Sequence, residues 1–328
     1  MARVFSGIQP TAQAHLGNLL GAVRHWVTDQ DEHDCLFCVV DLHSISVPHD
    51  PAELRSSTLD LAMVLLAAGL DPERSILFVQ SHVASEHAQL TWLLNSVATM
   101  GELGRMTQFK AKSEGRDSVS VALFDYPVLM AADVLLYQGE RVPVGDDQRQ
   151  HLELMRDVAI RFNARYGDTF KVPEGAIPRQ GARIMDLQQP ERKMSKTDGT
   201  ELGTIWLLDE PGRLKKKVMS AVTDSGAEVR AAADKPGVTA LLEILSIVRE
   251  TPIATLEDEF AGQGYGTFKK AVLEALVAYL EPIQARHREL REDPGEVERL
   301  LRRGAERARE LAAPTLAAAH DRLGFLPA

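Results

Sequence analysis

Apolar and polar positions follow two different rhythms along the first two hundred residues of the chain. Short runs rich in apolar residues, typical of strands, are separated by segments in which apolar residues recur every three or four positions, typical of helices. Strands that alternate with helices in this way build parallel sheets. The predicted strands are 3–8, 35–40, 75–80, 141–144 and 182–187, and the helices between them are 16–28, 51–69, 128–137 and 148–166.

This rhythm is interrupted once and then ends. After Gly101 the pattern loosens until the helix at 128–137, and we expect an insertion at about 101–140. Beyond Leu202 the strand signals stop, and helical patterns follow at 213–221, 238–250, 268–279 and 296–313. The sequence therefore predicts an α/β fold. It consists of a Rossmann-like parallel sheet with an internal helical insertion in residues 1–200, followed by a smaller all-α domain in residues 201–328.

The composition is that of an ordinary globular protein, and it excludes several classes. The 37 Lys and Arg against 47 Asp and Glu give a net charge of −10, so a nucleic-acid partner must meet a local basic patch rather than bulk positive charge. The longest apolar run, 61–70, is about half of the roughly 20 residues that cross a membrane. The N-terminus lacks the pattern of a signal peptide, and we expect a cytoplasmic protein with no membrane segment.

Other polar or glycine-rich features carry weaker signals. Cys35 and Cys38 point to opposite faces of a predicted strand, and we expect core positions rather than a disulfide or a metal site. The three glycines between 262 and 266 follow no strand and predict a loop between helices, not a nucleotide loop. Several histidines show no ligand-like grouping and are predicted to be surface or capping residues: His25, His33, His49, His82 and His87.

The first motif with clear chemistry is Pro-Thr-Ala-Gln-Ala-His-Leu-Gly-Asn, residues 10–18, between the first strand and the first helix. Ligands of α/β sheets bind at the carboxyl ends of strands, where a helix N-terminus offers unpaired N–H groups to a phosphate. Gly17 allows the backbone to come close to a nucleotide, and His15 and Asn18 can donate hydrogen bonds to it. The alternative is a helix cap with an incidental histidine.

A second motif, Lys-Met-Ser-Lys-Thr at residues 193–197, follows the predicted fifth strand. Two lysines three residues apart on a polar loop suit a pyrophosphate that must be neutralised as it leaves. For a lysine pair taken alone, a solvated basic turn is the better interpretation. Together the two motifs resemble the signatures of class I aminoacyl-tRNA synthetases, in the expected order and about 180 residues apart.

The resemblance extends over nearly the whole chain and points to one family within that class. Six further stretches are similar to those of bacterial tryptophanyl-tRNA synthetases: 5–10, 40–43, 101–110, 126–133, 142–148 and 221–225. The resemblance implies a Rossmann-like catalytic domain and activation of L-tryptophan by ATP with Mg²⁺. It also implies transfer to tRNA(Trp), a helical domain that recognises the anticodon, and a homodimer formed around the insertion. No protein metal site is implied.

The same resemblance assigns site residues. It implies catalytic roles for His15, Asn18, Lys193 and Lys196. It implies an ATP site made of Gln9, Pro10, Thr11, Gly17, Asn18, Lys112, Gly145, Asp146, Asp147, Ile184, Lys193, Met194, Ser195, Lys196 and Thr197. It implies a tryptophan pocket made of Phe5, Gly7, His43, Tyr126, Met130, Asp133, Val144 and Gln148. Thr197 stands where the family usually has serine, which keeps the hydroxyl.

Two of these assignments also follow from the residues themselves. Asp133 interrupts the apolar stretch 128–136, and a buried carboxylate needs a partner. An indole N–H is a donor only, so an acceptor-only carboxylate complements it; a helix-surface aspartate is the alternative. Asp147 follows a strand end, where a carboxylate can bind ribose hydroxyls. Its alternative is a helix N-cap, a role that Asp146 can fill instead.

Three other functions are weighed against tryptophan–tRNA ligation. Tyrosyl-tRNA synthetases share the fold and both signatures, but their pocket must receive a phenol hydroxyl, and no extra polar pair stands beside Asp133. A non-charging paralogue that binds tRNA usually loses a signature residue, and both signatures are present. A nicotinamide-dependent oxidoreductase needs a G-x-G-x-x-G turn after the first strand, which is missing. The arginines of 299–309, interleaved with glutamates, predict a solvated helix face, with a tRNA-backbone role as the weaker interpretation.

Overall fold

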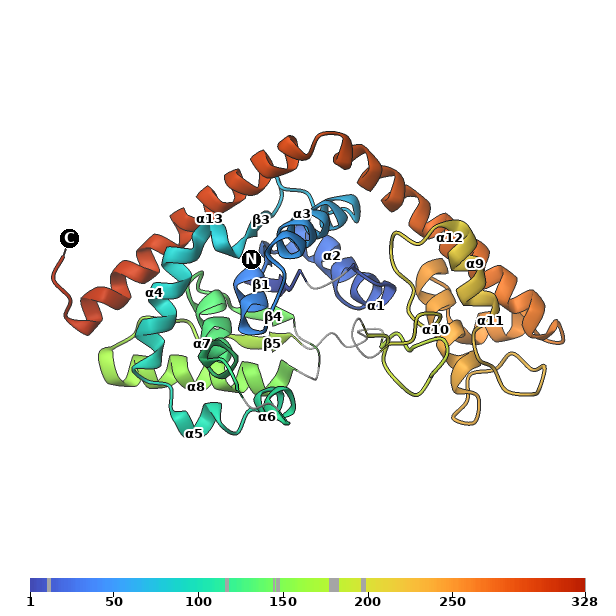
Figure 1. The fold of residues 1–328 in the computed structure, drawn as a ribbon, viewed down its shortest axis with the longest axis horizontal. Coiled ribbons are helices and arrows are strands. Elements are labelled where there is room, and N and C mark those ends of the chain that lie inside the picture. The colour runs from blue at the N-terminus through green and yellow to red at the C-terminus, as the bar shows by residue number, and fades with distance from the viewer. Residues whose placement is uncertain are drawn as a thin grey trace.

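A parallel five-stranded sheet lies at the centre of the protein (Figure 1). The computed structural model describes residues 1–10, 13–115, 118–143, 145, 148–176, 183–195 and 199–327. The strand order is β3-β2-β1-β4-β5, so the order reverses between β1 and β4, as in a Rossmann fold. The predicted α/β class is confirmed. The strands are β1 (Arg3–Ile8), β2 (Asp34–Val39), β3 (Ile76–Val79), β4 (Arg141–Pro143) and β5 (Glu174–Ala176).

Helices join and cover the strands. The first predicted helix consists of two α-helical pieces with a π-helical turn, Leu19–Val23, between them. The helices around the sheet are α1 (Leu16–Asn18), α2 (Arg24–Glu32), α3 (Pro51–Ala67), α4 (Ala84–Asn95) and α8 (Arg149–Tyr166). The segment where we expected an insertion contains α5 (Met100–Leu103), α6 (Thr107–Ser113) and α7 (Val121–Leu135). The chain then forms α9 (Pro211–Met219), α10 (Pro236–Arg249), α11 (Ile253–Glu259), α12 (Gly264–Glu292) and α13 (Pro294–Leu323).

The two faces of the sheet belong to two apolar cores, and β2 contributes alternately to both. Cys35 and Phe37 pack on the side of α2, α3, α10 and α12. Leu36 and Cys38 pack on the side of α4, α7, α8 and α13. Both cysteines are buried and unpaired, so the prediction that they are core residues on opposite faces is confirmed. This double burial explains why the strand reads as a continuous apolar run.

The predicted fifth strand at 182–187 is wrong. The strand that pairs with β4 is β5, which ends eight residues before Ile184. The segment from Ile184 pairs instead with the chain just after it, since the Met194 N–H donates to the Ile184 carbonyl at 2.9 Å and Met185 forms an antiparallel bridge with Lys193. The apolar pattern of the segment from Ile184 comes from burial with Met194 of the Lys-Met-Ser-Lys-Thr motif and not from a place in the sheet.

Helices α12 and α13 form a long arch that joins the helical part of the molecule to the sheet part (Figure 1). Helix α12 packs on α9 and α10, and α13 returns along β3 and α4. At the crossing, a Cβ added to Gly304 would overlap the carbonyl oxygen of Leu77, so only glycine permits this close approach. The later part of α13, which belongs to the expected helical domain, therefore contributes to the core of the sheet part through Ala305, Ala308, Ala312, Leu316 and Ala319.

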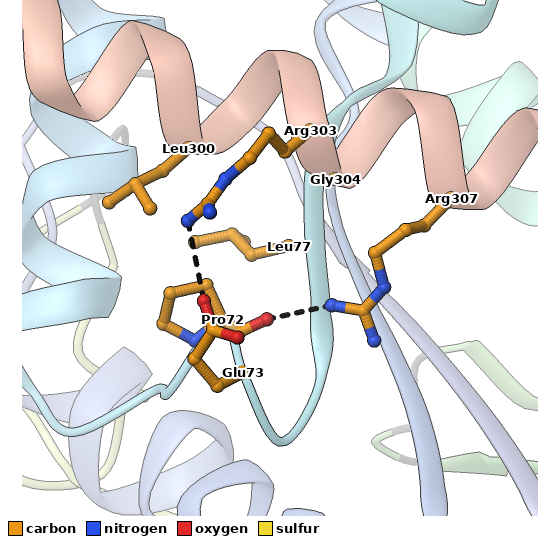
Figure 2. A pocket seen from close by; sticks show the side chains of 7 residues that line it. All are labelled: Pro72, Glu73, Leu77, Leu300, Arg303, Gly304 and Arg307. Atoms are coloured by element: carbon orange, nitrogen blue, oxygen red, sulfur yellow. Dashed lines mark hydrogen bonds and ion pairs between the residues drawn. The ribbon is translucent and has the colours of Figure 1, made fainter.

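Arginines fasten α13 to the turn before β3 (Figure 2). Arg303 pairs with Glu73 at 3.3 Å, and Arg307 donates to the carbonyl of Pro72 at 2.7 Å. A small pocket between them is lined by Pro72, Glu73, Leu77, Leu300, Arg303, Gly304 and Arg307.

The arginine-rich stretch of α13 thus has two roles. Arg299 and Arg302 pair with glutamates about one turn away, as predicted for a solvated face. Arg303, Arg307 and Arg309 instead reach groups of the sheet part. These three side chains are exposed, as predicted, but the predicted pairing within the helix is wrong for them, because the sequence could not reveal that the helix crosses the sheet edge. Within the described part of the chain, no helix is long and apolar enough to cross a membrane.

Candidate active site at the carboxyl edge of the sheet

Residues that the resemblance assigns to the site follow the ends of three strands. Gly7 lies near the end of β1 and Gln9 comes directly after it. His43 lies in the short 3₁₀ helix after β2, and Gly145 and Gln148 follow β4. Parallel strands end at the same edge, and ligands of such sheets bind where the strand order reverses, here between β1 and β4. The fold therefore places these residues along one edge.

The first signature forms a tight turn at the start of α1. His15 is 5% exposed and occupies the N-cap position. The side-chain oxygen of Asn18 accepts the backbone N–H of His15 at 3.1 Å, which commits the amide oxygen and not its two N–H protons. A Cβ on Gly17 would lie 2.9 Å from the His15 ring, so the glycine makes room for the imidazole. The π-helical turn that follows is a feature frequent at functional sites.

The second signature lies against the first. Met194 and Ile184 are both buried and share a core with the turn at 14–16. The Cβ of Ile184 lies 3.7 Å from where a side chain on Gly17 would begin. Lys193 is exposed. The fold thus brings the two signatures, which are far apart in sequence, next to each other. Lys193 of the lysine loop (residues 193–197) faces solvent.

Asp186 anchors the chain around the lysine loop, a role that was not predicted from the sequence. Its carboxylate is 2% exposed. It accepts the backbone N–H groups of Gln188 and Gln189 at 2.8 and 3.0 Å, before the loop. It also accepts the backbone N–H of Thr200 at 2.9 Å, after the loop. An aspartate that bonds backbone two residues on is a turn signal that could have pointed to it.

The segment after the lysine loop closes over the first signature. Backbone hydrogen bonds join residues 205–207 to residues 14–16, and the Trp206 ring meets the His15 ring edge-on with centroids 6.2 Å apart. Asp209 accepts the backbone N–H of Trp206 at 2.9 Å and pairs with the fully buried Lys217 of α9. The position of the signature histidine is therefore tied to the helical part of the chain.

At the other end of the site, Asp133 of α7 is the centre of a buried polar cluster. Its Oδ2 lies 2.8 Å from His43 Nε2. Its Oδ1 lies 2.6 Å from Gln80 Nε2 and 2.7 Å from His87 Nδ1. The other ring nitrogen of His87 lies 2.8 Å from the hydroxyl of Tyr137. We call these five residues the Asp133 cluster. It joins the ends of β2 and β3 to α4 and α7.

The environment fixes the charge of the cluster. Burial by itself would raise the pKa of Asp133, but His43 and His87 outweigh it and hold that pKa well below its usual range. Burial raises the pKa of the Tyr137 hydroxyl, which keeps its proton. The carboxylate is thus an acceptor only, and each imidazole nitrogen that faces it donates.

His87 corrects one prediction, because it is fully buried and not a surface or capping residue. Its partners come from another helix, so no local pattern could reveal them. Gln80 was also missed by the sequence analysis; its signal is its place directly after β3, at the same edge as the other strand ends.

Tyr126, which the resemblance assigns to the tryptophan pocket, lies beside Lys112, which it assigns to the ATP site. Its hydroxyl lies 2.7 Å from His151 Nε2, and its ring meets the His43 ring edge-on at 6.2 Å. The ammonium of Lys112 lies 5.6 Å from its ring centroid. Burial raises the pKa of Tyr126 to about 12, so the phenol is neutral. The fold therefore places Lys112 beside the residues that the resemblance assigns to tryptophan.

The other assigned residues divide into core and undescribed positions. Phe5 is 3% exposed and stacks on Tyr137 with ring centroids 5.6 Å apart; Met130, partly buried, precedes Asp133 by one helical turn. In the parts of the chain that the structure describes, no group of three or more His, Cys, Asp or Glu side chains could hold a metal ion. Six assigned residues lie outside the described residues: Thr11, Val144, Asp146, Asp147, Lys196 and Thr197.

Comparison with known proteins defines the class. Residues 1–281 match the family model of tRNA synthetases class I (W and Y). The chain belongs to this family of class I aminoacyl-tRNA synthetases, as its two signatures predicted. It is 54% identical over 330 residues to tryptophan–tRNA ligase 2 of Streptomyces avermitilis, covering 99% of this chain and 98% of the relative. It is 51% identical to the tryptophan–tRNA ligase of Caldanaerobacter subterraneus subsp. tengcongensis, covering 99% of both.

Solved structures agree with this relationship. The tryptophanyl-tRNA synthetase of Mycoplasma pneumoniae superimposes with a TM-score of 0.91 at 38% identity, covering 99% of this chain and 98% of that one. That of Campylobacter jejuni, in complex with ADP and tryptophan, gives 0.85 at 32% identity, covering 98% and 100%. A tyrosyl-tRNA synthetase from Aeropyrum pernix, at 21% identity and a TM-score of 0.68, shares the fold alone.

Proposed function

We propose that the chain is a tryptophan–tRNA ligase, which activates L-tryptophan with ATP and transfers it to tRNA(Trp). The observation that carries the proposal is Asp133, a buried and ionised carboxylate whose partner His43 lies against Tyr126. A carboxylate so placed accepts the N–H of an indole, which is a donor only. The proposal is supported by relatives of about 50% identity over the full length that are named tryptophan–tRNA ligases.

The proposed reaction needs positioning and charge stabilisation rather than a side-chain nucleophile. The carboxylate of tryptophan attacks the α-phosphorus of ATP in line, and pyrophosphate leaves. His15 and Asn18 donate to phosphate oxygens, and Lys193 and Lys196 neutralise the charge that develops on the leaving group. Mg²⁺ enters with ATP, on its phosphates. The 2′-hydroxyl of the terminal adenosine of the tRNA then attacks the carbonyl carbon of the tryptophanyl-adenylate, the mixed-anhydride bond breaks, and AMP leaves.

The tRNA is proposed to bind across both parts of the molecule, with residues 201–328 at the anticodon. Because the net charge of the chain is −10, tRNA must meet local basic patches. Affinity for tRNA should therefore fall steeply with salt, whereas tryptophan activation should change little. The two half-reactions measured between about 50 and 200 mM salt test this proposal, and parallel salt dependence would contradict a separate tRNA site.

The proposed homodimer would form around the helical insertion. Three large apolar side chains lie exposed on helices that pack together there: Trp92 of α4, 77% exposed, Met100 of α5, 75%, and Val121 of α7, 80%. Large apolar side chains exposed on neighbouring helices favour a protein interface there. Light scattering should give about twice the chain mass for the wild type, and Trp92→Glu should shift it toward the monomer.

The substrate is tested by ATP–pyrophosphate exchange with each of the twenty amino acids. Tryptophan alone should support exchange above background. Exchange with tyrosine in its place would identify a tyrosyl-tRNA synthetase. Binding of tRNA with no exchange for any amino acid would identify a non-charging paralogue.

A further inference from the structure

We infer that His87, Gln80 and Tyr137 are positioning residues for recognition of the indole ring, because together they hold Asp133 so that one lone pair of its Oδ2 is left for the ligand. This inference rests on the proposed function, since the indole N–H meets Asp133 only if the chain selects tryptophan.

The acceptor positions of the carboxylate can be counted. An ionised carboxylate has about four lone-pair sites, two on each oxygen. Gln80 and His87 occupy both sites of Oδ1, and His43 occupies one site of Oδ2. Among the described residues no other donor meets the carboxylate, so one acceptor site on Oδ2 is left. The side chain of His43 is 11% exposed and that of His87 is fully buried, so a ligand reaches Oδ2 from the side of His43.

Hydrogen-bond directions within the cluster are fixed from its buried end. The Tyr137 hydroxyl is fully buried and, among the described residues, bonds only to His87 Nε2. It must donate there, since its proton would otherwise be buried without a partner. Nε2 therefore accepts, and Nδ1 carries the proton that points to Asp133. Stacking of Tyr137 on Phe5 holds the phenol in place.

The amide of Gln80 is oriented in the same way. Its oxygen accepts the backbone N–H of Leu42 at 3.1 Å, so its NH₂ group is the end that faces Asp133. The same bond ties Gln80 to the residue before His43. The donors to both carboxylate oxygens are therefore set by one connected network, which keeps Asp133 ionised and fixes the plane of its carboxylate.

The test uses a tryptophan analogue that cannot donate a hydrogen bond to Asp133. In β-(3-benzothienyl)alanine a sulfur atom replaces the indole N–H, and ATP–pyrophosphate exchange gives kcat/KM for this analogue and for tryptophan. If Asp133 accepts the indole N–H, the wild type should prefer tryptophan by about 10- to 150-fold, the value of a hydrogen bond to a charged group. No preference in the wild type would overturn the assignment of Asp133 itself, and the inference with it.

The role of His87 is then tested by variants. The diagnostic quantity is the ratio of kcat/KM for tryptophan to kcat/KM for the analogue. His87→Leu should lower the preference for tryptophan about 10-fold, through KM and with kcat nearly unchanged, because the indole is remote from the reacting carboxylate. His87→Asn, which can still donate to Asp133, should restore part of the preference. If both substrates lose activity in parallel and the ratio stays at the wild-type value, His87 is only structural and the inference is wrong.

A control and a second variant complete the test. His287 is also buried and bonded to an aspartate, Asp60, at 2.9 Å, but on the seam of α12 and α3. His287→Leu should therefore leave the ratio unchanged.

Tyr137→Phe keeps the stacked ring and removes only the hydroxyl, so it serves if His87→Leu does not fold. It should lower the ratio about 2- to 10-fold, the value of one neutral hydrogen bond, and an unchanged ratio would contradict the inference.

Discussion

The two ends of the candidate site are held in different ways. The Asp133 cluster is built from side chains of four elements that bond to one another away from water. The signature loops are held by backbone pairing to residues 205–207 and by Asp186, while Lys193 remains exposed. A fixed buried acceptor suits selection of an amino acid, which requires an unchanging shape and charge. An exposed lysine on a loop, here Lys193, suits a charge that develops during the reaction.

The comparison predicts the largest effect at the nucleotide end. Lys196→Ala should lower the rate of adenylate formation by about 100-fold or more, the scale of losing one preorganised electrostatic group. The affinity for tryptophan should stay nearly intact, because the amino-acid end is untouched. Single-turnover adenylate formation and tryptophan binding measure the two quantities. An equal loss in both would show that the two ends are not separate.

At the amino-acid end the effect should be smaller and should depend on the substrate. Asp133→Ala should lower kcat/KM for tryptophan about 10- to 150-fold, since a hydrogen bond to a charged group is lost. The preference over phenylalanine should shrink as well, because phenylalanine then no longer leaves the remaining acceptor site of the buried carboxylate unfilled. Pyrophosphate exchange with both amino acids gives the ratio.

Asp125→Ala is the matched control for Asp133→Ala. Asp125 lies two turns earlier on the same helix and bonds to Asn95, so its removal should leave the preference for tryptophan near the wild-type value. If Asp133→Ala keeps its tryptophan rate and its selectivity, the pocket is elsewhere.

Loss of the anchor of the lysine loop should cost less than loss of a lysine. Asp186→Ala removes three backbone hydrogen bonds around the loop and should lower kcat for activation about 10-fold through misplaced lysines. The KM for tryptophan should be nearly unchanged. Glu191→Ala, an exposed acidic residue in the same turn, should stay within about two-fold of the wild type; a similar loss for both variants would contradict a specific anchor.

The smallest effect on activity is expected far from both ends. Gly304→Ala forces α13 away from the Leu77 carbonyl and should destabilise the protein by about 1–3 kcal/mol. This corresponds to a fall in Tm of roughly 2 °C or more by calorimetry, with both half-reactions nearly unchanged. Gly266 of α12 has open space around its missing side chain, so Gly266→Ala should leave the Tm unchanged or raise it slightly.

Local patterns predicted the elements better than their partners. The first strand and the helix that begins at Pro51 were predicted at their correct positions. Asp50 accepts the N–H groups of Ala52 and Glu53 there, and Gly69 ends the turn after the helix in a left-handed conformation. The fifth strand was misplaced, because burial against a loop produces the same apolar run as burial in a sheet.

The sequence by itself determined which residues carry the chemistry. The two signatures and the strand-helix alternation are local, and motif spacing is sufficient to identify the family. Asp133 was also accessible, since a lone carboxylate in an apolar helix requires a partner.

Only the tertiary structure decided which residues and elements are the partners of Asp133 and of α13. Asp133 bonds to residues that lie 46 to 90 positions away in the sequence, and α13 meets β3 more than 200 residues after it. Hydrogen bonds between distant segments depend on how strands and helices pack, because a polar side chain leaves no periodic trace of the donor it will meet. His87 and Gln80 could therefore be understood only after the ends of β2 and β3 were seen to lie together.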